Sequence, residues 1–293
     1  MIFSSNEYAF PGTWNIGRRT LDLTKRPCLM GILNVTPDSF SDGSYFLDPD
    51  RAVERALDME AQGADIIDIG GESTRPYATP VTEEDELERV LPVLRKLAGR
   101  LRIPISIDTY KAAVAREALL SGAEIVNDIS GMVFDSAMAD VVSSLNSGVI
   151  VTHTRGRPAE MQNDTGYHSL VEEILTALRE SLSLGESRGI KADRMVIDPG
   201  IGFGKSCGGN LLILNRLRDF TTLGRPVMVG TSRKSFIGSV LNRPVEDRIF
   251  GTAATTALAI ANGAAIVRVH DVREMRDVAD MTMAVLQTAP CNT

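Results

Sequence analysis

Three segments of the sequence share one pattern: GADIID at residues 63–68, GAEIVN at 122–127 and GAAIVR at 263–268. Each begins with a glycine of the kind that ends a helix, continues as a short apolar strand and finishes on a polar side chain. A glycine between a helix and a strand is the junction of an α/β repeat, so this pattern indicates a repeated structural unit.

The alternation of short apolar strands with longer helical segments extends through the chain from residue 28. The predicted strands are 28–34, 65–70, 103–108, 124–128, 148–153, 194–199, 225–230 and 265–270. Apolar residues at three- and four-residue spacing predict helices that include 50–62, 83–97, 111–120, 170–188 and 273–286. Eight βα units favour a closed (β/α)8 TIM barrel, and the alternative is an open, doubly wound parallel sheet.

The first 27 residues do not fit this alternation. They predict a small hairpin that turns near Asn15, Ile16 and Gly17, and we expect this hairpin to cap the bottom of the barrel. The length of 293 residues allows two domains, but one α/β barrel can occupy most of it. We therefore predict a hairpin at 1–27 and a single barrel domain at 28–293.

Composition excludes several classes of protein. The 31 basic and 38 acidic side chains give a formal charge of −7, which is unsuited to binding nucleic acid. The cysteines Cys28, Cys207 and Cys291 form no CxxC pair, so neither a disulfide framework nor a zinc site is indicated. No signal-like start or apolar run of about 18 residues suggests a membrane span. We expect a protein of the reducing cytoplasm.

Polar side chains stand where the predicted strands end. They are Asn34, Asp68, Asp108, Asn127, His153, Asp198, Arg268 and His270. Because side chains alternate along a strand, Asp68, Asn127 and Arg268 should face the same way. In a barrel these strand ends converge on the rim where active sites lie. The alternative is that the polar residues only mark where each strand meets solvent.

The charges at this rim suit a particular kind of ligand. Lys234 and Arg268 could neutralise part of the charge on the three aspartates, and a planar heterocycle with a guanidine-like edge could donate to a carboxylate through two parallel hydrogen bonds. The set of Asn34, Arg268 and His270 suits an anionic phosphate group together with Mg²⁺.

Other motifs do not support alternative chemistries. The segment DPGIGFGKS at 198–206 has proline at 199 and lysine at 205, where a phosphate-binding loop and a dinucleotide fingerprint respectively require glycine. The three histidines have no zinc-protease spacing, and no nucleophile elbow occurs. The acidic segment TEEDELERV at 82–90 predicts a solvated helix face.

Seven segments, in this order and spacing, resemble the dihydropteroate synthase family. They are MGILNVTPDSFSDG (30–43), DIGGESTRP (68–76), SIDT (106–109), NDISG (127–131), DPGIGFGK (198–205), TSRKSFIG (231–238) and RVHDV (268–272). The resemblance extends from Leu29 to Leu286. It implies a (β/α)8 barrel and a Mg²⁺-dependent transferase of folate biosynthesis, the target of sulfonamides. The implied reaction joins 6-hydroxymethyl-7,8-dihydropterin pyrophosphate to p-aminobenzoate and releases pyrophosphate.

The resemblance also implies roles for individual residues. The pterin would bind to Asp108, Asn127, Asp198, Lys234 and Phe203. Pyrophosphate would bind to Asn34, Arg268 and His270, with Asn34 as the metal ligand. The p-aminobenzoate would bind to Phe40, Thr74, Arg75, Pro76 and Ser235. The catalytic set would be Asn34, Asp108, Lys234 and Arg268, acting by a dissociative mechanism in which pyrophosphate leaves before the amine attacks.

Further expectations concern the assembly of the protein and the mobility of its loops. The small-residue stretch at 252–265 allows close helix packing, and the family implies a homodimer. We expect 36–45 and 231–238 to be mobile lids, whereas the alternative is that Phe40 and Phe236 anchor them.

The sequence departs from the family pattern in two places. One is Thr152-His153-Thr154-Arg155-Gly156, where Thr152 replaces an apolar contact beneath the pterin, and the other is the SCGGN segment after Lys205.

Two other functions remain as alternatives. One is a pterin-binding methyltransferase, a related barrel, but the segments NVTPDSF and SRKS favour the synthase over it. The other is a barrel that binds pterin without turnover.

Overall fold

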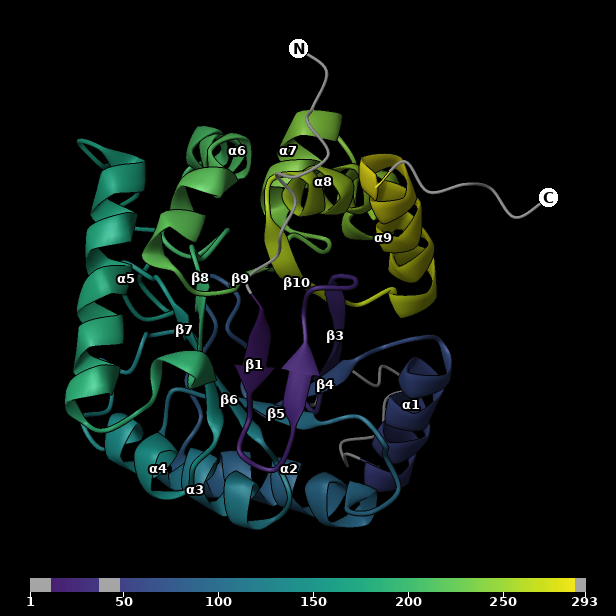
Figure 1. Ribbon diagram of the computed structural model, residues 1–293, viewed down its shortest axis with the longest axis vertical. Coiled ribbons are helices and arrows are strands. Elements are labelled where there is room, and N and C mark those ends of the chain that lie inside the picture. Colours follow the sequence, from purple (N-terminus) through teal and green to yellow (C-terminus); the bar gives the residue numbers. More distant parts are fainter. Residues whose placement is uncertain (1–11, 37–47, 288–293) are drawn as a thin grey trace.

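The computed structural model describes residues 12–36 and 48–287, and its centre is a closed barrel of parallel strands (Figure 1). The strand order around the barrel is β10-β3-β4-β5-β6-β7-β8-β9. The bounds are β3 (Cys28–Asn34), β4 (Ile66–Gly70), β5 (Ile105–Asp108), β6 (Ile125–Asp128), β7 (Gly148–Thr152), β8 (Met195–Asp198), β9 (Val227–Val229) and β10 (Ala264–Val269). The predicted closed (β/α)8 barrel is confirmed, and the open sheet is excluded.

Helices cover the outside of the barrel. They are α1 (Pro49–Ala61), α2 (Glu83–Leu97), α3 (Ala112–Leu120), α4 (Met138–Ser144), α5 (Leu170–Ser187), α6 (Cys207–Asn215), α7 (Ser235–Leu241), α8 (Ile249–Ala261) and α9 (Val272–Gln287). Local capping explains several of their starts: Asp48 accepts from the Asp50 N–H before α1, and Thr82 accepts from the Asp85 N–H before α2. The described helices include none that is long and apolar enough to cross a membrane.

The strands are buried on both faces, which explains why their sequences are almost continuously apolar. Their inward side chains fill the barrel and their outward side chains pack under the helices. The seventh barrel strand is shorter than predicted, since β9 covers only Val227–Val229 of the expected 225–230. Pro226 has no N–H to donate to a neighbouring strand, although its carbonyl accepts the Ile197 N–H of β8 over 3.0 Å, so the regular strand begins at Val227.

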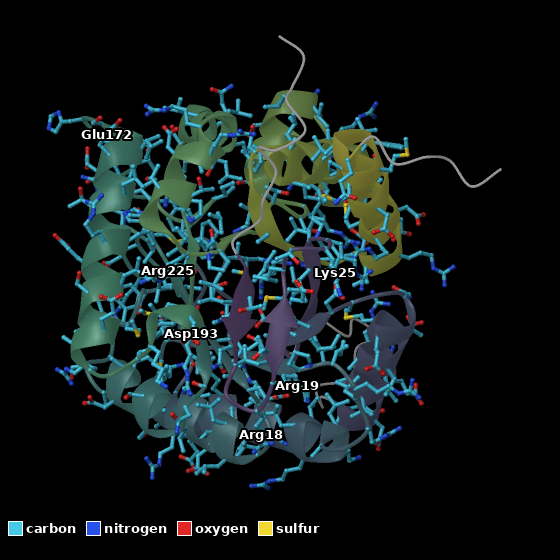
Figure 2. The ribbon with its side chains drawn as sticks, viewed as in Figure 1. Arg18, Arg19, Lys25, Glu172, Asp193 and Arg225 are labelled. Carbon is cyan, nitrogen blue, oxygen red and sulfur yellow. The ribbon has the colours of Figure 1, made fainter. Side chains whose placement is uncertain are left out.

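A hairpin of β1 (Thr13–Asn15) and β2 (Thr20–Asp22) lies at the end of the barrel where strands begin. Trp14 donates from Nε1 to the carbonyl of Arg194, which directly precedes β8, over 2.9 Å. Arg19, labelled in Figure 2, donates from Nε to Glu124, directly before β6, over 3.0 Å. The predicted hairpin is therefore present, and its side chains contact the starts of barrel strands.

Candidate active site

The opposite end of the barrel carries a row of polar residues. The strand register pairs Asn34 with Gly70, Gly70 with Asp108, and Asp108 with Asn127, so the ends of β3 to β6 lie at one level. Asp198 ends β8 beside Thr152 of β7. The closed barrel brings these strand ends to one rim, because parallel strands all finish at the same end.

Arg268 links two of the aspartates at this rim. Its Nε lies 2.6 Å from Oδ2 of Asp68, and its Nη2 lies 2.7 Å from Oδ2 of Asp108. Asn127 donates from Nδ2 to the same Asp68 oxygen over 3.0 Å. The three residues expected to face the same way, Asp68, Asn127 and Arg268, are therefore bonded to one another. Asp68 was absent from the predicted binding set, although its strand position placed it at the rim.

Each of these two carboxylates keeps one oxygen available. Oδ1 of Asp68 and Oδ1 of Asp108 are buried and have no hydrogen-bond partner among the described residues. An unpaired buried acceptor is costly, so a ligand that brings N–H groups to it gains binding energy. The rim thus offers buried acceptors to a ligand with several N–H donors.

Burial raises the pKa values of two rim carboxyl groups. It raises the pKa of Asp108 to about 7, although Arg268 opposes the shift. It raises the pKa of Asp198 to about 6, although the Gly200 N–H donates to Oδ1 over 2.7 Å. Both groups therefore change charge near neutral pH, which is common at functional sites.

Lys234 and Phe203 lie together beside Asp198. The Nζ atom of Lys234 is 4.1 Å from the centre of the Phe203 ring, and burial lowers the pKa of Lys234 to about 8. A side chain at Gly202, where φ is +85°, would approach Lys234 Cδ to 2.9 Å. The glycine lets the loop after β8 lie against the lysine, so one aromatic face and one cation line the same part of the rim.

Lys205 is a buried lysine that the sequence analysis did not assign to the site. Its Nζ lies 2.9 Å from Nδ1 of His153 and 2.8 Å from the carbonyl of Phe203. Burial lowers the pKa of Lys205 well below its usual value and lowers that of His153 to about 2. The contacts attach the loop after β8 to the end of β7. Lys205 stands in the DPGIGFGK segment that carries the resemblance, but its burial depends on contact with His153, 52 residues away, which a local motif does not reveal.

His270 lies at the end of β10 against the β9–α7 segment. Its Nδ1 is 2.9 Å from the buried hydroxyl of Ser232. Burial and the neighbouring Arg268 lower the pKa of His270 to about 3, and Arg75 contributes to the same shift. The largest charge effect on His270 therefore comes from Arg268, two residues before it on the same strand.

The candidate residues for p-aminobenzoate occupy more exposed positions. Arg75, Pro76 and Ser235 are exposed and Thr74 is half-buried. Ser235 is the first residue of α7 and directly follows Lys234. Phe40 lies outside the described residues. The structure thus places the described members of this group, Thr74, Arg75, Pro76 and Ser235, at the solvent side of the rim.

The β9–α7 segment has several attachments. Phe236 and Ile237 are buried, Arg233 donates to Asp271 from Nε over 3.0 Å, and its N–H donates to Thr252 over 3.1 Å. These contacts favour the alternative in which Phe236 anchors 231–238, rather than the expected mobile lid. Most of the other expected lid, 36–45, lies outside the described residues.

The rim offers few protein ligands for Mg²⁺. Within residues 12–36 and 48–287, no group of three or more His, Cys, Asp or Glu residues could hold a metal. Asn34 offers one neutral oxygen at the end of β3 and is half-buried. Mg²⁺ is commonly held by one or two protein oxygens together with water and substrate phosphates, so this donor set suits a metal that arrives with pyrophosphate.

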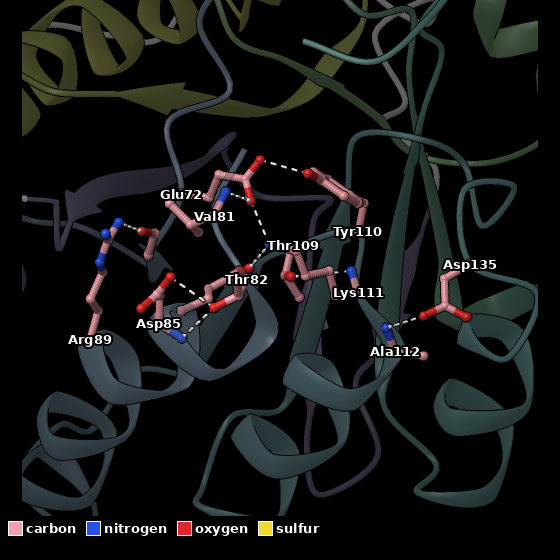
Figure 3. Close-up of polar contacts among 12 residues, drawn as sticks. Glu72, Val81, Thr82, Asp85, Arg89, Thr109, Tyr110, Lys111, Ala112 and Asp135 are labelled. Atoms are coloured by element: carbon pink, nitrogen blue, oxygen red, sulfur yellow. Dashed lines mark hydrogen bonds and ion pairs between the residues drawn. The ribbon is translucent and has the colours of Figure 1, made fainter. Parts of the chain in front are cut away.

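A second polar cluster joins the loop after β4, the loop after β5 and the start of α2 (Figure 3). Lys111 contacts both Glu72 and Glu86, whose side chains are 4% and 1% exposed. The expectation that the acidic segment 82–90 is solvated is wrong for Glu86. Its partner comes from a different βα unit, so the local charge pattern could not reveal the burial.

Comparison with known proteins adds independent evidence to this geometry. A family model described as "Pterin binding enzyme" matches residues 30–270, which is most of the chain. The chain therefore belongs to the pterin-binding enzymes.

Individual relatives give a finer placement. The dihydropteroate synthase of Synechocystis is 45% identical over 277 residues, covering 94% of this chain and 96% of that protein. A Clostridium difficile dihydropteroate synthase solved with pteroic acid is 48% identical, with a TM-score of 0.84 and coverage of 89% and 97%. The Xanthomonas albilineans enzyme solved with 4-aminobenzoic acid is 40% identical, with a TM-score of 0.89 and coverage of 96% and 100%. Within the pterin-binding enzymes, the chain is a member of the dihydropteroate synthases.

Proposed function

We propose that the rim joins 6-hydroxymethyl-7,8-dihydropterin pyrophosphate to p-aminobenzoate by a dissociative mechanism. The observation that carries this proposal is the Arg268 guanidinium bound to two buried aspartates, Asp68 and Asp108, in the mouth of the barrel. A cation held at this position can stabilise a departing anion, while the aspartates can stabilise positive charge on the ring that remains.

The pterin ring would lie among Asp108, Asn127, Asp198 and Lys234, with Phe203 against its face. As carboxylates, Asp108 and Asp198 accept from N–H groups of the ring, and Asn127 can both donate and accept. The buried, unpaired Oδ1 of Asp108 supports this assignment because it needs a donor. Lys234 would donate to a ring oxygen or nitrogen.

Pyrophosphate would lie among Asn34, Arg268 and His270. Mg²⁺ held by Asn34 and the phosphate oxygens would, when bound, stabilise negative charge on the leaving group. Arg268 would donate to the phosphate oxygens, and the neutral imidazole of His270 would add one N–H. The same side chains therefore bind the ground state and the departing anion.

The bond changes balance without a covalent enzyme intermediate. The C–O bond to pyrophosphate breaks and its electron pair leaves with the phosphate. The resulting cationic pterin methylene is stabilised by Asp108, and the lone pair of the p-aminobenzoate nitrogen then forms the new C–N bond. That nitrogen then releases one proton to water at the solvent side of the rim. Thr74, Arg75, Pro76, Phe40 and Ser235 would hold the amine in place.

We also propose that two copies of the chain associate through α7, α8 and α9. These helices expose several large apolar side chains, and Phe250 is 82% exposed. The exposed set is Val240 and Leu241 on α7, Phe250 and Leu258 on α8, and Met281 and Val285 on α9, with Val245 in the segment between α7 and α8. Exposed apolar side chains on neighbouring helices are typical of an interface, and a homodimer would cover them.

The remaining proposals concern organisation and location. We propose that residues 28–293 form one barrel domain and that 1–27 form its cap. The free thiols of Cys28 and Cys207 support a location in the reducing cytoplasm.

A coupled assay of pyrophosphate release tests the proposed function. Purified protein with both substrates and Mg²⁺ should release pyrophosphate and form dihydropteroate in equal amounts, and Asp108→Asn should lose most of this activity while remaining folded. Binding of the pterin substrate without product would instead establish a non-catalytic binder. Methyl transfer from methyltetrahydrofolate without pyrophosphate release would establish the methyltransferase.

A further inference from the structure

The segment between β4 and α2 is attached at both ends while its middle is exposed. Thr74, Arg75 and Pro76 form the middle, and Arg75 and Pro76 are exposed to solvent. This part has little apolar surface to bury, so its own packing cannot fix its conformation. The hydrogen bonds within it are local, from the Arg75 N–H to Ser73 Oγ and from the Ala78 N–H to the Arg75 carbonyl, so the attachments at Glu72 and Tyr77 fix where it lies against other elements.

The first attachment is a buried cluster around Glu72 (Figure 3). Tyr110 donates from its hydroxyl to Oε1 of Glu72 over 2.6 Å, and Lys111 donates to Oε2 of the same carboxylate. Lys111 also donates to Glu86 of α2, so one ammonium group joins the β4–α2 segment, the start of α3 and α2. Burial and the contact with Glu72 raise the pKa of Tyr110, which keeps its hydroxyl protonated as a donor.

The second attachment lies three residues beyond Thr74. The N–H of Tyr77 donates to the carbonyl of Pro158 over 2.9 Å, and Tyr77 itself adopts a φ of +63°. The neighbouring Arg157 places its guanidinium 5.4 Å from the centre of the Tyr110 ring. The two attachments therefore converge on Tyr110, which contacts Glu72 through its hydroxyl and Arg157 through its ring.

We propose that Lys111 and Tyr110 are positioning residues that preset the segment 73–76 for the aromatic amine substrate. This inference rests on the proposed function, which assigns Thr74, Arg75 and Pro76 to p-aminobenzoate. Neither Lys111 nor Tyr110 is proposed to touch a substrate. They act through Glu72, two residues before Thr74, and remove conformational freedom that the amine would otherwise have to restrict on binding.

The cluster has hydrogen-bond partners of its own, although Tyr110 and Lys111 follow Asp108 closely in the chain and the charge of Glu86 acts on Asp108. Its contacts are to Glu72 and Glu86, whereas Asp108 is paired with Arg268, Asn127 donates to Asp68, Asp198 accepts from the Gly200 N–H and Lys234 lies over the Phe203 ring. Loosening the cluster should therefore alter binding of the amine and leave binding of the pterin unchanged. A residue with a general structural role would affect both substrates together.

Steady-state kinetics with each substrate varied in turn tests the proposal. Tyr110→Phe removes one hydrogen bond without changing charge or shape, and we expect it to raise KM for p-aminobenzoate about fivefold. The values of kcat and of KM for the pterin substrate should stay within about twofold of wild type. Lys111→Met should raise KM for the amine at least as much, and Lys111→Arg should restore part of the loss because it keeps the cation.

Two control variants and the wild type distinguish failure of the positioning role from failure of the proposed function. Tyr167→Phe removes a hydroxyl that donates to Gly204, and Lys96→Met removes an ion pair with Asp50, so neither should change KM for the amine. Equal changes in both KM values and kcat, or an unchanged KM for the amine in folded Tyr110→Phe, would overturn the proposal. Failure of the wild type to form dihydropteroate would instead overturn the proposed function.

Discussion

The hydroxyl of Ser232 contacts His270 twice: it lies 2.9 Å from Nδ1, and it accepts the backbone N–H of His270 over 3.2 Å. Since the hydroxyl oxygen already accepts from the backbone, we expect its proton to point to Nδ1. The imidazole would then carry its own proton on Nε2, where it can donate to a phosphate oxygen.

Nuclear magnetic resonance of labelled histidine can check this tautomer directly. The lowered pKa of His270, about 3, predicts a neutral ring from pH 8 to pH 5. We expect Ser232→Ala to weaken pyrophosphate binding about fivefold and to leave binding of a non-phosphorylated pterin unchanged. Ser239→Ala on α7 is the control, and a charged His270 at pH 6 would contradict the prediction.

Asp198→Asn should weaken binding of the pterin strongly. An amide places a donor where the carboxylate accepts, so hydrogen bonds worth about 1.5–3 kcal/mol are lost, which is roughly tenfold to a hundredfold in affinity. Calorimetry with a pterin analogue measures the change. Unchanged affinity in the folded variant would show that Asp198 does not contact the ring.

Acid should weaken pterin binding through two groups at the rim. Burial raises the pKa of Asp108 to about 7 and that of Asp198 to about 6, so a falling pH protonates first one acceptor and then the other. Below pH 6 we expect the dissociation constant to rise about tenfold per pH unit for each proton that must be released. Asp198→Asn should remove the lower step, and a flat profile from pH 8 to pH 5 would refute the assignment.

Arg268→Lys should reduce turnover more than it reduces binding of the pterin ring. Lysine keeps the charge but donates from a single nitrogen, whereas Arg268 reaches Asp68 from Nε and Asp108 from Nη2, and the lost stabilisation falls on the departing pyrophosphate. We expect kcat to fall roughly a hundredfold. Arg225→Lys, which alters an ion pair with Glu186 away from the rim (Figure 2), should retain normal turnover. Equal losses in kcat and in ring affinity would contradict this role.

Hydrogen exchange should show that α7 is protected before any ligand binds. Phe236 and Ile237 are buried, and Arg248 donates to the carbonyl of Arg233 over 3.0 Å. Amides in 236–241 should therefore exchange slowly in the free protein and change little with pyrophosphate, Mg²⁺ and p-aminobenzoate present. Protection that arises only in the mixture of ligands would restore the mobile-lid hypothesis for 231–238.

The sequence predicted the barrel because each strand is a short apolar run whose ends are marked by nearby residues. The first barrel strand was predicted at 28–34 and β3 is Cys28–Asn34, since its apolar run is bounded by proline and by polar residues. Side-chain alternation also predicted that Asp68, Asn127 and Arg268 would meet. Local patterns could not predict contacts between distant units: Glu72 and Lys111 are 39 residues apart, and Lys205 and His153 are 52 apart.

Trp14 is the single tryptophan of the chain, and its indole is fully buried at the end of the barrel opposite the rim. Its fluorescence is therefore a built-in optical probe of the fold that no ligand at the rim can quench by contact. A red shift of its emission would report exposure of the hairpin side of the barrel. Denaturation curves followed by the emission of Trp14 can show whether a rim variant has lost its folded structure or only its catalytic activity.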